Sequence, residues 1–111
     1  MAEFINLEEG LGRVRNNKKL YKRMLSLFLA SDQFVALEDA LAAGDFAHAA
    51  DVAHGIKGMS GNLSLNAVYE TSTELTEQLR KGAPDPAMLA AYREAYAGTI
   101  PVVERTAAEL E

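Results

Sequence analysis

One histidine stands in an unusual local sequence. Residues 54–61 read HGIKGMSG, so three glycines lie close to His54 and Lys57 in a stretch whose pattern is otherwise helical. Each glycine inside a helix costs about 0.5–1 kcal/mol relative to alanine. An imidazole can act as a base, a metal ligand or a nucleophile that forms a covalent bond. A nearby lysine can offset negative charge on a phosphoryl group, so this stretch is the candidate site.

The helical periodicity predicts that His54 points away from the core. Successive residues turn by about 100° around a helix, which puts the apolar side chains of this stretch on the opposite side. The residues expected on the face of His54 are all small: Ala47, Ala50, Gly58 and Gly61. We interpret this strip as space for another molecule to approach the ring. The alternative is that the histidine has no role and that the small residues mark a close contact between helices.

Several chemistries lack support in the sequence. A metal site needs three or four ligands, but His48 lies about 120° around the helix from His54 and no third ligand is evident. No cleft for a hydrolytic triad and no nucleotide-binding motif is recognisable. Residues 58–61 spell the GxxG of KH domains, which also needs strands and a basic surface. A phosphohistidine remains, formed by attack on a phosphoryl group held by a partner; it requires no cofactor here, and Mg²⁺ is expected on the partner only.

Composition and charge indicate one cytoplasmic domain over residues 1–111. The chain has no cysteine, and its hydrophobic content of 49% is enough for a core. Its net charge of −5 makes it a poor ligand for nucleic acid. The basic run at 13–23 is interpreted as a solvated helix face, with a small patch for an acidic partner as the alternative. No signal peptide is recognisable and no apolar run approaches the roughly 18 residues of a membrane span.

Helical periodicity runs through the whole chain, and no strand is predicted. We expect an all-α fold, an antiparallel up-down four-helix bundle with a short N-terminal leader helix. The leader is predicted at about 6–15, with a capping box that begins at Asn6, and the bundle helices at about 17–43, 45–62, 64–81 and 85–110. Ser31-Asp32 is expected to bend or divide the first bundle helix, Ser64 to cap the third and Pro101 to kink the last.

Residues 53–63, AHGIKGMSGNL, resemble the signature of histidine phosphotransfer (HPt) domains, approximately A-H-x-L-K-G-x-[SA]-x-x-L-G. The matching positions are Ala53, His54, Lys57, Gly58, Ser60 and Leu63, with Ile56 in place of leucine. Chain length and helix order fit as well. The resemblance implies a phosphorelay protein of two-component signalling that carries a phosphoryl group on His54, through Nε2. It also implies that Lys57 steadies the phosphate and that Gly58 leaves room for it.

The chain departs from the family pattern at two places. Ser64 stands where the family often has glycine, and we interpret it as an N-cap. The facing helix of the family often offers Glu or Gln to the second ring nitrogen, but counting along the chain places Thr76 there. Thr76 is therefore the candidate for orienting the ring, with Ala50 and Gly61 as supporting residues beside His54.

The resemblance implies receiver domains of response regulators, histidine kinases, or both, as partners. The expected docking surface comprises the exposed parts of 47–62 and 65–80, joined by apolar residues of the leader or early second helix. We expect a monomer that associates transiently and binds neither nucleic acid nor membranes. Two alternatives are an HPt-like bundle that serves only as a protein-binding adaptor and the histidine-bearing domain of a larger kinase.

Overall fold

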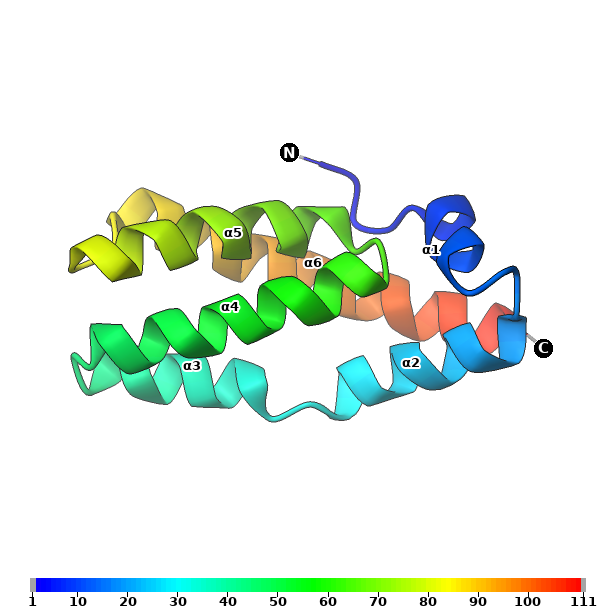
Figure 1. Ribbon diagram of the computed structural model, residues 1–111, viewed down its shortest axis with the longest axis horizontal. Helices are drawn as coiled ribbons and strands as arrows, with labels where there is room; N and C mark the ends of the chain where they lie inside the picture. The colour runs from blue at the N-terminus through cyan, green and yellow to red at the C-terminus, as the bar shows by residue number, and fades with distance from the viewer. Residues whose placement is uncertain (1, 111) are drawn as a thin grey trace.

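The computed structural model describes residues 2–110, which form six helices and no strand (Figure 1). The all-helical prediction is therefore confirmed for this part of the chain. The helices are α1 (Leu7–Arg13), α2 (Lys18–Ala30), α3 (Gln33–Ala42), α4 (Phe46–Asn62), α5 (Asn66–Lys81) and α6 (Pro86–Glu109). None of these helices is both long and apolar enough to cross a bilayer.

Side-chain caps explain where four of the helices begin. The Asn6, Asn17, Asp45 and Asp85 side chains each accept a hydrogen bond from a backbone N–H in the first turn of the following helix, at 2.9–3.1 Å. Such caps satisfy N–H groups that have no partner within the helix. The predicted starts near 6, 17, 45 and 85 therefore agree with the structure.

The predicted helix 17–43 is divided rather than bent. Ser31 is extended (φ −66°, ψ 138°) and ends α2, and α3 starts at Gln33. Pro101 does not break α6, which continues through it to Glu109.

The prediction that Ser64 caps α5 is wrong. Leu65 precedes the first helical residue of α5, and Ser64 adopts the left-handed conformation (φ 57°) just beyond α4. The Leu65 N–H donates to the Ser60 carbonyl at 2.9 Å, as in the common helix ending that places glycine at this left-handed position. Ser64 therefore fills a position that favours glycine, because the tight α4–α5 turn requires a positive φ there.

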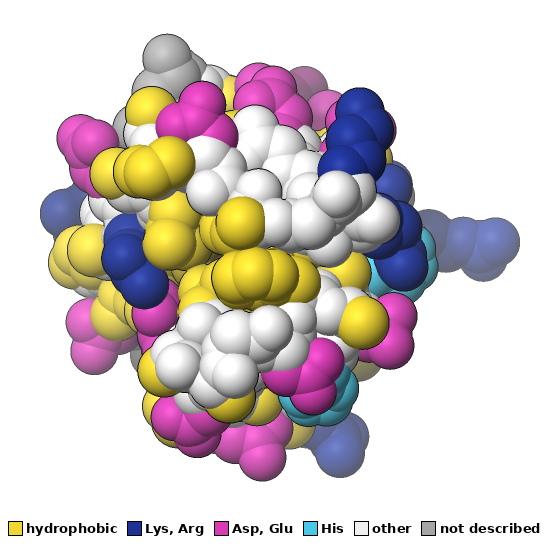
Figure 2. Space-filling model, turned by 90° about the vertical axis from the view of Figure 1, so that its left-hand side faces the viewer, with side chains coloured by type: hydrophobic (Ala, Val, Ile, Leu, Met, Phe, Trp, Pro, Cys, Tyr) yellow, Lys and Arg dark blue, Asp and Glu magenta, His cyan; other side chains and the backbone are white. Residues whose placement is uncertain are grey.

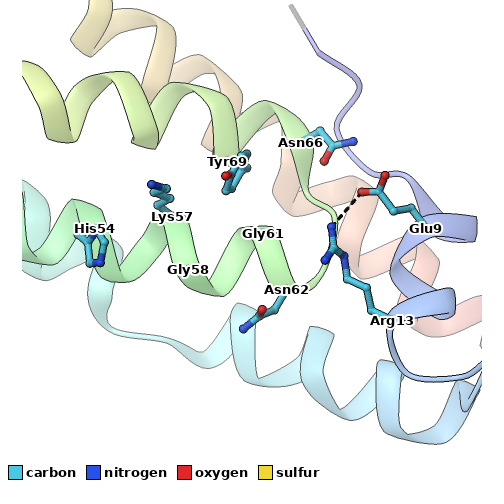
Figure 3. Close-up of a pocket in the computed structure, with 9 residues that line it drawn as sticks. All are labelled: Glu9, Arg13, His54, Lys57, Gly58, Gly61, Asn62, Asn66 and Tyr69. Carbon is cyan, nitrogen blue, oxygen red and sulfur yellow. Dashed lines mark hydrogen bonds and ion pairs between the residues drawn. The ribbon is translucent and has the colours of Figure 1, made fainter.

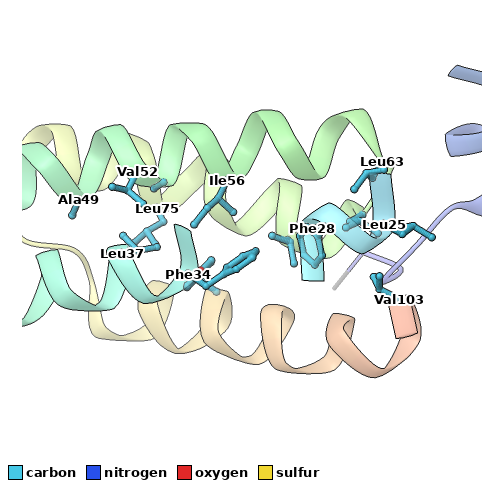
Figure 4. Close-up of a cluster of buried hydrophobic side chains, with 14 of the residues drawn as sticks. Leu25, Phe28, Phe34, Leu37, Ala49, Val52, Ile56, Leu63, Leu75 and Val103 are labelled. Atoms are coloured by element: carbon cyan, nitrogen blue, oxygen red, sulfur yellow. The ribbon is translucent and has the colours of Figure 1, made fainter. Parts of the chain in front are cut away.

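The helices α3, α4, α5 and α6 pack in sequence, each running opposite to the one before it, and α2 packs on α6 (Figure 1). Their shared core contains Phe28, Phe34, Leu37, Ile56 and Leu75 (Figure 4). Phe34 meets Phe28 edge to face with ring centroids 5.1 Å apart. This packing buries one side of α4 between α3 and α5 and leaves its other side outside.

An N-terminal leader segment, residues 3–13, is fastened to the α4–α5 turn. The Asn6 N–H donates to the Ser64 carbonyl at 2.9 Å, and the Ala67 N–H donates to the Glu3 carbonyl at 3.0 Å. Gly10 lies on the ring of Tyr21, where a Cβ would come within 2.5 Å of the phenol oxygen. The leader therefore has a defined place beside the turn that joins α4 to α5.

Tyr21 is hydrogen-bonded to the chain just before the α4–α5 turn, and the contribution of this bond to the stability of the protein can be tested. Its fully buried phenol donates to the Leu63 carbonyl at 2.6 Å. Burial raises the pKa of Tyr21 to about 12. The stabilisation from this group is therefore complete below about pH 10, the ordinary tyrosine value, and is lost as the pH rises through the folded-state value.

We expect Tyr21→Phe to lower the free energy of unfolding by about 1–2 kcal/mol at pH 7, because the Leu63 carbonyl loses its donor. The difference between the two proteins should shrink between pH 10 and 12. Urea titrations at pH 7, 10 and 11.5 measure this, and a difference independent of pH would contradict the assignment.

Candidate functional site

His54 is exposed on the outer side of α4, as the helical periodicity predicts. The opposite side of the helix is buried and contains Ala49, Ala53, Ile56 and Ser60. The fold therefore presents the imidazole to solvent near the middle of a 17-residue helix.

A groove of about 400 Å³ runs from His54 toward the leader (Figure 3). We call it the α4 groove; its lining residues are Glu9, Arg13, His54, Lys57, Gly58, Gly61, Asn62, Asn66 and Tyr69. His54 lies at one end of the groove, and Arg13 and Glu9 lie at the other. The sequence alone predicts that His54 and Lys57 share a helix. That residues of α1 and α5 also line this groove is shown only by the fold.

Two contacts determine which part of α5 lies opposite His54. Gly61 lies against Tyr69, and Asp51 pairs with Arg80, whose Nη1 is 3.7 Å from Asp51 Oδ1. Because α4 and α5 run in opposite directions, these two pairs place residues 76–77 at the level of His54. The predicted level of Thr76 therefore agrees with the register of the two helices.

Thr76 does not orient the ring in this structure. It is buried, and its hydroxyl donates to the Ser72 carbonyl of its own helix at 2.7 Å. Among residues 2–110, none makes a hydrogen bond to either nitrogen of His54. The predicted role of Thr76 has no contact to support it in this structure, where its hydroxyl bonds only within α5.

Two of the glycines differ in what surrounds them. A Cβ on Gly58 would meet nothing within 4 Å, whereas a Cβ on Gly61 would lie 2.9 Å from Cδ1 of Tyr69. The packing of Tyr69 is therefore enough to explain Gly61, although Gly61 also lines the α4 groove with His54. No packing contact requires a glycine at 58. The interpretation that Gly58 leaves room for a partner to approach His54 therefore stays a prediction. At Gly55 the nearest contact would be an ordinary one, 3.7 Å from Gln33, and nothing in the structure explains that glycine.

Ala50 also departs from its expected place on an open strip. Only 1% of its surface is exposed. It lines a separate hollow with Leu79 and Arg80, where α5 covers the beginning of α4. The strip of small residues is thus part helix contact, at Ala50 and Gly61, and part open surface, at Ala47 and Gly58. Ala50 is covered because α5 crosses α4 there, and the periodicity of α4 alone does not determine that crossing point.

Charges of both signs lie near His54, and Lys57 is the cation nearest to it along α4. Lys57 is partly buried and makes no ion pair with any residue that the structure describes. Arg80 and Asp51 form an exposed pair one turn before His54. Figure 2 shows Lys and Arg side chains, and also acidic side chains, beside the histidines on this view of the molecule. An anion brought to His54 therefore meets local cations although the net charge of the chain is −5.

Three residues of this region were not named individually from the sequence. Arg13 and Tyr69 line the α4 groove, and Arg80 reaches α4 from α5. Arg13 belongs to the basic run at 13–23, and Tyr69 and Arg80 fall at or within the expected docking segment 65–80, but only the fold shows that they lie beside α4. Metal ligation finds no support, since residues 2–110 contain no group of three His, Asp or Glu side chains able to hold an ion.

Comparison with known families agrees with this geometry. The family model for the Hpt domain matches residues 23–110, so the chain belongs to the Hpt domain family. Searches of curated proteins and of solved structures returned no match. Membership of this family implies histidine phosphotransfer in two-component signalling, in which Hpt domains interact with receiver domains and histidine kinases.

The two glycines provide a matched pair for a stability test. Gly58→Ala should raise the free energy of unfolding by about 0.5–1 kcal/mol, because alanine favours the helix and its Cβ has room. Gly61→Ala should lack this gain, since the Tyr69 ring must move. Thermal and urea unfolding of both variants should differ by about 1 kcal/mol. Equal stability would show that Tyr69 does not restrict position 61.

Proposed function

We propose that this protein relays phosphoryl groups through a phosphohistidine at His54, between receiver aspartates or from a histidine kinase to a receiver. The observation that carries the proposal is the exposed imidazole of an Hpt chain, with Lys57 on the next turn and an unfilled space at Gly58. We further propose that α2 and α3 together count as one helix of an antiparallel four-helix bundle. The protein would then be a monomer that works in the cytoplasm.

The transfer itself needs few groups from this chain. The Nε2 lone pair of neutral His54 attacks the phosphorus of an aspartyl phosphate on the receiver. The N–P bond forms while the P–O bond to the aspartate breaks, and the electron pair of that bond stays on the released carboxylate. The Nδ1 proton is left to exchange with water, since no described residue holds it. Transfer to a second receiver reverses these steps.

Lys57 and Gly58 are assigned complementary roles in this step. Lys57 lies one turn after His54 and has no anionic partner among the described residues, so its ammonium can accompany the charge of the moving phosphoryl group. Gly58 keeps the adjacent surface free of a side chain, which lets the receiver approach within bonding distance. Mg²⁺ would remain with the receiver, and no cofactor is assigned to this chain.

An apolar surface next to α4 is proposed as part of the docking site. Met24, Leu27 and Phe28 of α2 and Met59 of α4 line a shallow hollow, and 63% of Leu27 is exposed. Leu27 is exposed, Met24 and Met59 are partly buried, and Phe28 forms the buried floor, so the hollow offers an apolar contact to another protein. Met59 lies five residues after His54 on α4, about 140° around the helix, so a receiver that rests on this surface must extend around α4 to reach the ring.

A panel of phosphorylated receiver domains tests the site assignment. We expect the wild-type chain to acquire an acid-labile, alkali-stable phosphate from at least one receiver and none from ATP alone. His54→Gln should abolish the label. Lys57→Gln should slow transfer roughly tenfold, since one stabilising charge is lost. Gly58→Ala should also slow it even though that variant is more stable. Labelling that survives His54→Gln would reject the site, and partner function that survives His54→Gln would favour the adaptor alternative.

Two equally exposed apolar residues test the docking surface. Leu27→Asp should weaken binding of the labelling receiver by about tenfold, because it places a charge in an apolar contact. Val35→Asp is the matched control: 65% of Val35 is exposed, and it lies about 200° around α3 from Gln33, which faces α4. Titration by fluorescence anisotropy compares them. If both substitutions weaken binding equally, the proposed surface is wrong.

A further inference from the structure

The leader places an arginine at the end of the α4 groove that is remote from His54. We propose that Arg13 binds a surface carboxylate of the receiver that docks over His54, and thereby helps to select which receivers this chain serves. This inference rests on the proposed phosphotransfer function. It assigns a recognition role to an element that the chemistry at His54 does not use.

Arg13 is held in place before any partner arrives. Its Nε donates to the Ser64 hydroxyl at 3.1 Å, and its Nη2 is 3.5 Å from Glu9 Oε1 (Figure 3). The leader is itself fastened to the α4–α5 turn by the bonds of Asn6 and Glu3. A side chain that is already positioned loses less conformational entropy when it binds.

The guanidinium still has capacity for an anion. It carries five N–H donors, and the two contacts above engage only two of them. About half of the side chain is exposed, at 52%. The contact with Glu9 is long and exposed, so it is a weak competitor for another carboxylate.

The position of Arg13 excludes a direct part in the chemistry. Ser64, to which it bonds, is ten residues after His54, which corresponds to about 15 Å along a helix axis. Arg13 therefore contacts the partner rather than the phosphoryl group. The residues that line the α4 groove include two cationic side chains, Arg13 and Lys57, and one acidic side chain, Glu9. The charge of the groove therefore favours an acidic partner surface.

Arg13 lies outside the part of the chain that the family comparison covers. The Hpt match covers residues 23–110 and begins within α2, after α1. His54, Lys57 and Gly58 lie within the match. The recognition role of Arg13 therefore rests on its contacts and its charge.

The test compares variants of two oppositely charged residues of α1, Arg13 and Glu9. The receiver is the one to which the wild-type chain transfers phosphate fastest. Arg13→Gln keeps a donor for Ser64 but removes the charge, and should lower the second-order rate constant of transfer about fivefold at low ionic strength. Glu9→Gln should raise it about twofold. Both effects should fade in 0.5 M salt, because mobile ions screen exposed charges.

Three controls separate recognition from structure. Arg13→Lys should recover most of the rate, and Arg105→Gln, an exposed arginine on α6 that does not line the α4 groove, should match the wild type. Circular dichroism checks that each variant is folded. The proposal is overturned if Arg13→Gln equals Arg105→Gln in rate and salt dependence, or if Glu9→Gln and Arg13→Gln both slow transfer. Labelling of wild-type His54 by phosphoramidate, with His54→Gln as the blank, reports independently on the proposed function.

Discussion

Burial of one side of α4 between α3 and α5 is the constraint on which the rest of this structure depends. Ala49, Ala53, Ile56 and Ser60 contribute to that buried side, and Ser60 satisfies its hydroxyl by donating to the Ile56 carbonyl at 2.7 Å. A helix buried on one side must present the residues of its other side to solvent. His54 lies on that other side of α4 and is exposed for this reason alone.

The glycines of α4 show how packing and access can be told apart. Both Gly58 and Gly61 weaken the helix, yet only Gly61 is covered, by the ring of Tyr69. At Gly58 a Cβ would fit without contact, so packing does not explain the glycine, and access for a partner is the reason that we propose for it. Of these two glycines, Gly58 is therefore the one for which packing gives no explanation.

The surroundings of His54 combine a small set of cations with an acidic chain. Lys57 stands on α4, Arg80 comes from α5 and Arg13 from α1, so three different helices supply positive charge to one side of the molecule. Arg80 is engaged by Asp51, and Arg13 is bonded to Ser64, which limits how freely either side chain moves. These cations are the features on which our proposal of an acidic receiver surface rests.

The helices, most of their starting points and the outward direction of His54 followed from the sequence alone, because periodicity and capping are local properties of the chain. The resemblance of residues 53–63 to the Hpt signature likewise pointed to the family that the match over 23–110 establishes. The tertiary structure decided what periodicity cannot express: that Ala50 is covered by α5, that Thr76 is turned inward, and that Ser64 takes a left-handed turn position instead of a cap. It also decided that Arg13 stands beside the α4–α5 turn. Each of these depends on where two helices cross or how a turn closes, and such contacts join residues whose positions in the chain carry no common pattern.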